Sequence, residues 1–275
     1  MEGIIRVSEI WQAERKLAML IDGDNAQHNL LKQMFEEASR HGEVTIRRAY
    51  GDWTEPNLAN WRSVMLAHAI QPIQQWRYTT GKNATDSALI IDAMDILYSG
   101  TVQGFCVISS DSDYTRLCTR IRESGLFVMG IGREKTPEAF INACNVFVYV
   151  ENLMQSNEVN IATTVKKTDE VKTPAVVKAP ATAKQPAKAK LDGSQIDLLN
   201  LLRRAFDVAV QNDDGWVHLG PLGNALQRIE PSFDSRTYGY KSLSLLIKSM
   251  PKQIEVKGTK KSGPSTIYAR MKDTN

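Results

Sequence analysis

The chain has 275 residues, of which 42% are hydrophobic and 24% charged, and it carries a formal net charge of +3. This length leaves room for two domains, and the composition is that of a globular protein with a buried core. No apolar run is long enough to span a bilayer, and the N-terminal residues mix charged with apolar side chains, unlike a secretory signal. We therefore expect a cytoplasmic protein without a membrane segment.

The charge is distributed unevenly along the chain. Residues 1–150 have a net charge of −3 (15 Lys and Arg against 18 Asp and Glu), residues 151–192 have +2 (7 against 5), and residues 193–275 have +4 (12 against 8). A mildly acidic body with a basic tail is typical of a catalytic module that is delivered to a polyanion.

The cysteines and histidines do not have the spacing of a zinc site. No CxxC, HxH or HExxH pattern occurs, which argues against a histidine or cysteine metal centre and against a disulfide framework. We expect Cys106, Cys118 and Cys144 to be buried in the core.

In chain order, short apolar runs alternate with helical patterns up to residue 150. The pattern predicts strands at 17–21, 44–50, 73–78, 105–110, 126–132 and 146–150. It predicts helices at 28–41, 57–70, 85–100 and 114–125, and a short helix that Thr136 caps and Pro137 opens. Such alternation indicates an α/β domain with a parallel sheet covered by helices on both faces.

The next segment changes in composition. Residues 153–192 are rich in Ala, Pro, Lys and Thr and lack aromatic residues, so we expect a disordered linker between a first domain at 1–152 and a second at 193–273. In the second domain the pattern predicts helices at 194–211, 219–229 and 240–250, followed by a β-hairpin at 253–271. Three helices and a hairpin make a winged helix.

Aspartates follow two of the buried strands directly. Asp22 and Asp24 end the first run, and Asp111 and Asp113 follow the run at 105–110. The carboxyl ends of parallel strands form the ligand crevice of such sheets, and Asp86, at the start of a helix, can enter it from a third side. A single aspartate there is usually a helix cap, as Asp113 would be before the next helix. Two pairs of aspartates, each directly after a buried strand, favour a functional site over simple capping.

Converging carboxylates repel one another, and a divalent cation relieves that repulsion. Carboxylate oxygens are the ligands that Mg²⁺ or Mn²⁺ prefers, and such a site can activate water against a phosphodiester. Asn25, Ser109, Ser110 and Lys82 are supporting candidates for metal or phosphate contacts; a turn, a strand end and a solvated loop are the structural alternatives for them. We expect structural pairing for Asp92 and Asp95, which are rotated away from Asp86. The Gly130-Ile-Gly132 sequence is too short for a dinucleotide fingerprint.

Three segments together resemble the NYN domains of the PIN-like nuclease superfamily. They are LAMLIDGDNAQ, GKNATDSALIIDAMDIL, and GFCVISSDSDYTRLCTRIRESGLFVMGIG with TPEAFINACNVFVYVE, and the likeness extends over residues 14–152. The resemblance implies a PIN-like, Rossmann-type fold. It also implies a metal-dependent endoribonuclease with ligands from Asp22, Asp86, Asp111 and Asp113. Asn25 falls within the first motif.

The tail is similar to the LOTUS, or OST-HTH, domain, most clearly in FDSRTYGYKSLSLLI. That similarity implies a winged helix that binds RNA or a protein partner. Cations and aromatic rings in the tail suit RNA phosphates and unpaired bases, with core packing or a solvated turn as the alternatives. The candidate RNA-binding residues are Arg236, Tyr238, Tyr240, Lys241, Lys257, Lys260 and Lys261.

Two other functions compete with the ribonuclease. The first is a non-catalytic RNA-binding adaptor with a vestigial site, which the complete carboxylate set argues against. The second is a phosphatase of the haloacid-dehalogenase type, suggested by Asp22-x-Asp24 after the first strand. That family has Thr or Val two residues after the second Asp, whereas here Ala26 occupies the place in question and no lysine motif follows in order.

Overall fold

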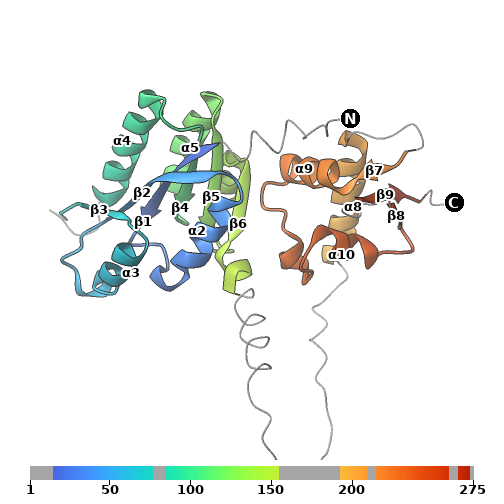
Figure 1. Cartoon of the computed structure of the whole chain (residues 1–275), viewed down its shortest axis with the longest axis horizontal. Helices are drawn as coiled ribbons and strands as arrows, with labels where there is room; N and C mark the ends of the chain where they lie inside the picture. Colours follow the sequence, from blue (N-terminus) through green and yellow to red (C-terminus); the bar gives the residue numbers. More distant parts are fainter. Residues whose placement is uncertain (1–14, 77–83, 155–192, 210–214, 260–265, 273–275) are drawn as a thin grey trace, which may run out of the picture. The chain divides into compact units, whose positions relative to one another are not determined.

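The computed structural model describes residues 15–76, 84–154, 193–209, 215–259 and 266–272 (Figure 1). The chain divides into two units, Met1–Met154 with Glu230–Ser242, and Gln155–Ile229 with Leu243–Asn275. The predicted linker at 153–192 lies almost wholly outside the described residues. No helix in the described part of the chain is long and apolar enough to cross a membrane.

The first unit is built on a six-stranded sheet in the order β3-β2-β1-β4-β5-β6, with every neighbouring pair parallel. The strands are β1 (Lys16–Asp22), β2 (Glu43–Gly51), β3 (Gln71–Gln74), β4 (Gly104–Ile108), β5 (Phe127–Gly132) and β6 (Val146–Tyr149). The chain first builds outward from β1 to β3 and then returns to the other side of β1, so the order of strands reverses between β1 and β4. The predicted parallel α/β domain is confirmed.

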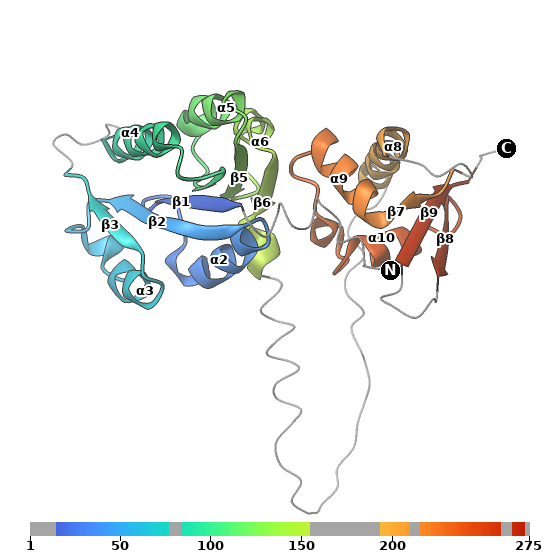
Figure 2. The ribbon, with the colours of Figure 1, turned by 45° about the horizontal axis from the view of Figure 1, so that its top comes forward.

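Helices cover both faces of this sheet, with α4, α5 and α6 on one side and α2 and α3 on the other (Figure 2). The helices are α2 (Leu31–Ser39), α3 (Trp61–Ala67), α4 (Ala84–Ser99), α5 (Thr115–Glu123) and α6 (Glu138–Ala143). Short 3-10 turns, η1 (His28–Leu30), η2 (Pro56–Leu58) and η3 (Ser112–Tyr114), precede α2, α3 and α5.

The apolar run of β1 is continuous because both faces of the strand are buried. Leu17, Met19 and Ile21 pack on the face with α2 and α3, whereas Ala18 and Leu20 pack on the face with α4, α5 and α6. The three cysteines are free and buried, as predicted.

Two details of the predicted helices were wrong. The helix expected at 57–70 is a 3-10 turn followed by the shorter α3, which ends before Ala69, a residue with a positive φ of 50°. Thr136 does not cap α6: its hydroxyl donates to the carbonyl of Arg133 at 2.7 Å, and Pro137 occupies the N-cap position.

The second unit has α8 (Gly193–Val208), α9 (Leu219–Ile229) and α10 (Leu243–Lys248) beside a three-stranded antiparallel sheet in the order β7-β9-β8. The strands are β7 (Val217–His218), β8 (Ile254–Thr259) and β9 (Thr266–Met271). The predicted helices and hairpin are confirmed, whereas the two-residue β7 was not predicted. The third helix is shorter than the predicted 240–250, because α10 begins at Leu243 and ends at Lys248. The preceding η4 (Ser235–Tyr238) and the left-handed Gly239, with φ 80°, belong to the first unit.

Candidate metal centre

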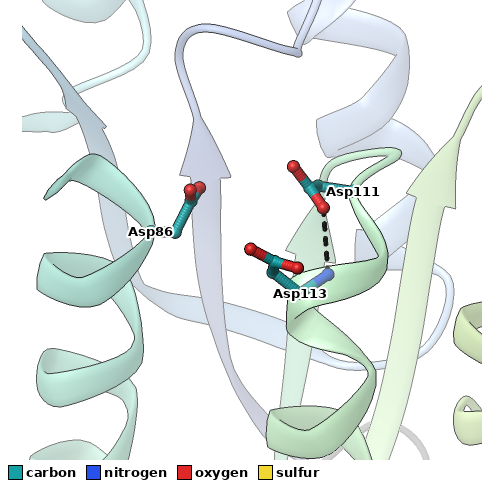
Figure 3. Close-up of side chains that lie close together, drawn as sticks. All are labelled: Asp86, Asp111 and Asp113. Carbon is teal, nitrogen blue, oxygen red and sulfur yellow. Dashed lines mark hydrogen bonds between the residues drawn. The ribbon is translucent and has the colours of Figure 1, made fainter. Parts of the chain in front are cut away.

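Three carboxylates meet at the carboxyl end of the sheet, where the strand order reverses between β1 and β4. Asp86 lies in the first turn of α4, and Asp111 and Asp113 lie in the turn after β4 (Figure 3). One ligand oxygen from each residue lies within 4.8 Å of the others. A crevice at this position is where open α/β sheets bind ligands. The structure thus brings together three of the four carboxylates that the sequence predicted for the site.

The turn after β4 is held in shape by one of the carboxylates. Asp111 is the N-cap of η3, and its Oδ1 accepts a hydrogen bond from the backbone N–H of Asp113 at 2.9 Å. A helix cap was the structural alternative for Asp113, but Asp111 is the residue that caps η3, and the exposed Asp113 contributes an oxygen to the group. Capping and site membership thus coexist in Asp111.

Asp22 differs from the other three because it is completely buried at the end of β1. Its Oδ2 accepts hydrogen bonds from Asn25 Nδ2 at 2.7 Å and from Ser109 Oγ at 2.8 Å, and its Oδ1 accepts from the backbone N–H of Asp24 at 3.1 Å. Asp22 is not one of the three residues whose oxygens gather within 4.8 Å. Asp22 is instead a buried residue linked through Ser109 to the end of the neighbouring strand β4.

Burial and like charge raise the pKa values of two of these aspartates. Desolvation is the main cause of the raised pKa of Asp22; the hydrogen bonds from Asn25 and Ser109 oppose it, and the charges of Asp86 and Asp24 add to it. The pKa of Asp86 is also raised, chiefly by desolvation and further by Asp111, Asp113 and Asp24, whereas the hydrogen bond from Tyr114 lowers it. The site therefore favours either protons or a cation.

Three nearby residues have roles that the sequence did not reveal. The buried Tyr114 donates its hydroxyl to Asp86 Oδ1 at 2.6 Å. Thr85 donates to Asp24 Oδ2 at 3.3 Å, which puts Asp24, a minor candidate from the sequence, at the edge of the group. Ser109, considered for phosphate contact, is instead buried against Asp22.

The residues that the sequence suggested as supporting the site lie in different places in the fold. Asn25 lies beside Asp22, whereas the hydroxyl of Ser110 accepts a hydrogen bond from the backbone N–H of Arg133 at 2.9 Å, at the end of β5. Lys82 lies outside the described residues. Asp92 is paired with Arg48 and Tyr50, which confirms its predicted structural role.

The candidate RNA-binding residues of the tail occupy different surroundings. Arg236 makes a two-pronged contact with Asp234, at 2.6 Å for its closest nitrogen. Lys257 is exposed on β8, with its Nζ 4.0 Å from the ring centroid of Trp216. Tyr238 has its ring 6.0 Å from that of Phe233. Of the rest, Tyr240 is half-buried and Lys241 exposed, and Lys260 and Lys261 lie outside the described residues.

Comparison with known proteins gives two family matches. A model of the NYN domain matches residues 16–153, and a model of the OST-HTH/LOTUS domain matches residues 190–266. A search of curated proteins gives no match to the chain.

Solved structures also match parts of the chain. A protein of unknown function from Vibrio parahaemolyticus is similar over 55% of this chain and 96% of its own, with 17% identity and a TM-score of 0.43. An uncharacterised protein from Nitrosomonas europaea is similar over 38% of this chain and 95% of its own, with 27% identity and a TM-score of 0.27.

Proposed function

The chain belongs to the NYN family and carries a C-terminal OST-HTH/LOTUS domain, and from this premise we propose that it is a metal-dependent ribonuclease. In this proposal Mg²⁺ or Mn²⁺ bound to carboxylates serves the hydrolysis of RNA phosphodiester bonds within the strand. The C-terminal domain binds RNA and selects the substrate.

The proposal rests on the close approach of three carboxylates: one oxygen from each of Asp86, Asp111 and Asp113 lies within 4.8 Å of the other two. Three carboxylates whose oxygens lie this close repel one another, and the charges of Asp111, Asp113 and Asp24 add to the raised pKa of Asp86. A bound divalent cation relieves this repulsion.

The donor set suits a hard cation. All the side-chain donors are carboxylate oxygens, which Mg²⁺ and Mn²⁺ prefer over the nitrogen and sulfur ligands of zinc or copper. Such a cation lowers the pKa of a bound water and stabilises charge on a scissile phosphate. Around it, Asp86, Asp111 and Asp113 provide the ligands, and Asp22 contributes negative charge from within the protein, held in place by Asn25.

The second unit supports RNA as the substrate. Lys257 is exposed on β8 and its ammonium lies over the Trp216 ring. Arg270, on β9, lies over the same ring, with its Cζ 4.8 Å from the centroid. Exposed cations that an aromatic ring holds in place can contact RNA phosphates. A protein partner of this domain remains the alternative that a binding assay decides.

Cleavage of RNA by the purified full-length chain tests the proposed function. The substrates are single-stranded, hairpin and circular RNAs, with Mg²⁺, Mn²⁺ or a chelator present. We expect metal-dependent cleavage, including cleavage of the circular RNA, which has no ends. Asp86→Asn and Asp111→Asn should each reduce the rate by at least about 100-fold, because removing even a residue that supports a metal ligand often has an effect of this size. Asp95→Asn, an exposed position on the same helix, is the matched control.

The same assay separates the competing functions. RNA binding without cleavage by the wild type, under every metal condition, would refute the nuclease and favour the adaptor. Hydrolysis of a generic phosphate monoester in place of RNA would favour the phosphatase. Cleavage that persists in both aspartate variants at the wild-type rate would exclude this group of carboxylates as the active site.

A further inference from the structure

One short turn provides two of the carboxylates and also contacts the third. The 3-10 turn η3 contains Asp113 and, as its next residue, Tyr114. Asp113 is exposed and belongs to the group of carboxylates, whereas Tyr114 is fully buried, with its ring 6.5 Å from the ring of Phe140. The hydroxyl of Tyr114 donates a hydrogen bond to Asp86 Oδ1 at 2.6 Å.

This hydrogen bond ties α4 to the turn after β4. Asp86 lies in the first turn of its helix, and an aspartate at such a position is free to adopt several rotamers unless something restrains it. The Tyr114 ring is fixed by the core, so its hydroxyl is a fixed donor. A carboxylate has about four acceptor sites, which leaves Asp86 able to bind a cation while it accepts the phenol.

We propose that Tyr114 is a positioning residue, whose hydroxyl holds the Asp86 carboxylate toward Asp111 and Asp113 so that the three bind one divalent cation. The inference rests on the metal site of the proposed function. It assigns Tyr114 no contact with substrate. Its effect is transmitted entirely through Asp86, in the way that a residue hydrogen-bonded to a metal ligand fixes that ligand's orientation.

The test is Mn²⁺ binding to the full-length chain, measured by titration calorimetry and electron paramagnetic resonance without RNA. Tyr114→Phe removes only the hydroxyl, and we expect Mn²⁺ affinity to fall by about 10- to 100-fold. Tyr50→Phe is a matched control, because Tyr50 is also fully buried and donates its hydroxyl to an aspartate of α4, Asp92. We expect Mn²⁺ affinity in that variant to equal the wild-type value.

A double-mutant cycle distinguishes positioning from general loosening of the fold. If Tyr114 acts through Asp86, Tyr114→Phe should have no further effect on Mn²⁺ affinity once Asp86→Asn is present. Additive losses in the double variant would refute the positioning role, as would wild-type affinity in Tyr114→Phe. If thermal unfolding shows that Tyr114→Phe is not folded, the titrations are repeated with an osmolyte, which favours the folded state.

The outcomes for this inference and for the proposed function are distinguishable. Absence of saturable Mn²⁺ binding in the wild type would refute the metal site itself, and the positioning role with it. Saturable binding that Asp86→Asn weakens and Tyr114→Phe does not would refute only the role of Tyr114.

Discussion

The hydroxyl of Ser109 donates a hydrogen bond to the buried carboxylate of Asp22, with 2.8 Å between Ser109 Oγ and Asp22 Oδ2. Ser109→Ala would leave that carboxylate with one side-chain donor, Asn25. Because a buried polar group that loses a partner costs about 1–3 kcal/mol, we expect the free energy of unfolding in urea to fall by that amount. Ser39→Ala, at an exposed position of α2, should change it by less than about 0.5 kcal/mol. Equal effects in the two variants would contradict a supporting role for Ser109.

The raised pKa of Asp22 predicts a pH dependence of stability in the metal-free chain. As the pH rises from the ordinary value of 3.8, the unfolded chain loses this proton first, while the folded chain keeps it to higher pH. The folded state thus binds more protons, so this group lowers the free energy of unfolding as the pH rises through that window.

Comparison with Asp22→Asn isolates this effect. We expect the free energy of unfolding of the variant, minus that of the wild type, to grow with pH at up to about 1.4 kcal/mol per unit and then to level off. Urea unfolding between pH 4 and pH 9 in a chelator measures it. A difference that shrinks with rising pH would contradict the sign of the pKa shift.

Asp111 has two roles that two substitutions separate. Asparagine retains the N-cap of η3 but removes the charge, whereas alanine removes both. We expect Asp111→Ala to be less stable than Asp111→Asn by about 1 kcal/mol in metal-free thermal unfolding, and both to lose Mn²⁺ affinity equally. A large difference in Mn²⁺ affinity between the two variants would mean that the cap itself shapes the site.

Gly132 is required by close packing at the end of β5. A Cβ there would lie 2.6 Å from the carbonyl oxygen of Ser109 and 2.8 Å from the ring of Phe147. Gly132→Ala should therefore lower the free energy of unfolding by about 1–3 kcal/mol, as overpacked cores do. Gly258→Ala is the control, because a Cβ on that strand residue meets nothing within 4 Å. Similar urea midpoints for the two variants would contradict this explanation.

A substitution of Lys257 tests the RNA-binding surface that we propose for the second unit. Lys257→Gln should weaken binding to single-stranded RNA by a similar factor for different sequences and reduce the slope of log affinity against log salt concentration by about one. Fluorescence anisotropy at several salt concentrations measures both. Lys32→Gln, on an exposed lysine of α2, should leave the slope unchanged. An unchanged slope in Lys257→Gln would exclude a phosphate contact by this lysine.

The sequence predicted where the carboxylates would come together because strand ends are visible in it. The apolar runs before Asp22 and Asp111 reflect burial on both faces of β1 and β4, and the parallel arrangement then brings their carboxyl ends together. The two-residue β7 left no comparable signal, because it is too short to show an alternating pattern.

The burial of each aspartate and the orientation of the Tyr114 ring could not be predicted from the sequence. Asp22 and Asp111 look equivalent after their strands, yet only Asp22 is fully buried, because it is still the last residue of β1 while Asp111 lies beyond the end of β4. The contact of Tyr114 with Asp86 spans 28 residues and depends on the direction of a core ring. Neither is encoded by hydrophobic periodicity.

The central position of β1 also has a consequence for how the protein is made. Asp22 finds its partner Ser109 only 87 residues later in the chain, on a strand that is added after β2 and β3 have been synthesised. During synthesis a ribosome-bound chain that ends before β4 therefore has the Asp22 and Asp86 residues but neither Asp111 nor Asp113. The group of Asp86, Asp111 and Asp113 is complete only once β4 and the turn after it have folded, so a truncated nascent product lacks two of the three carboxylates.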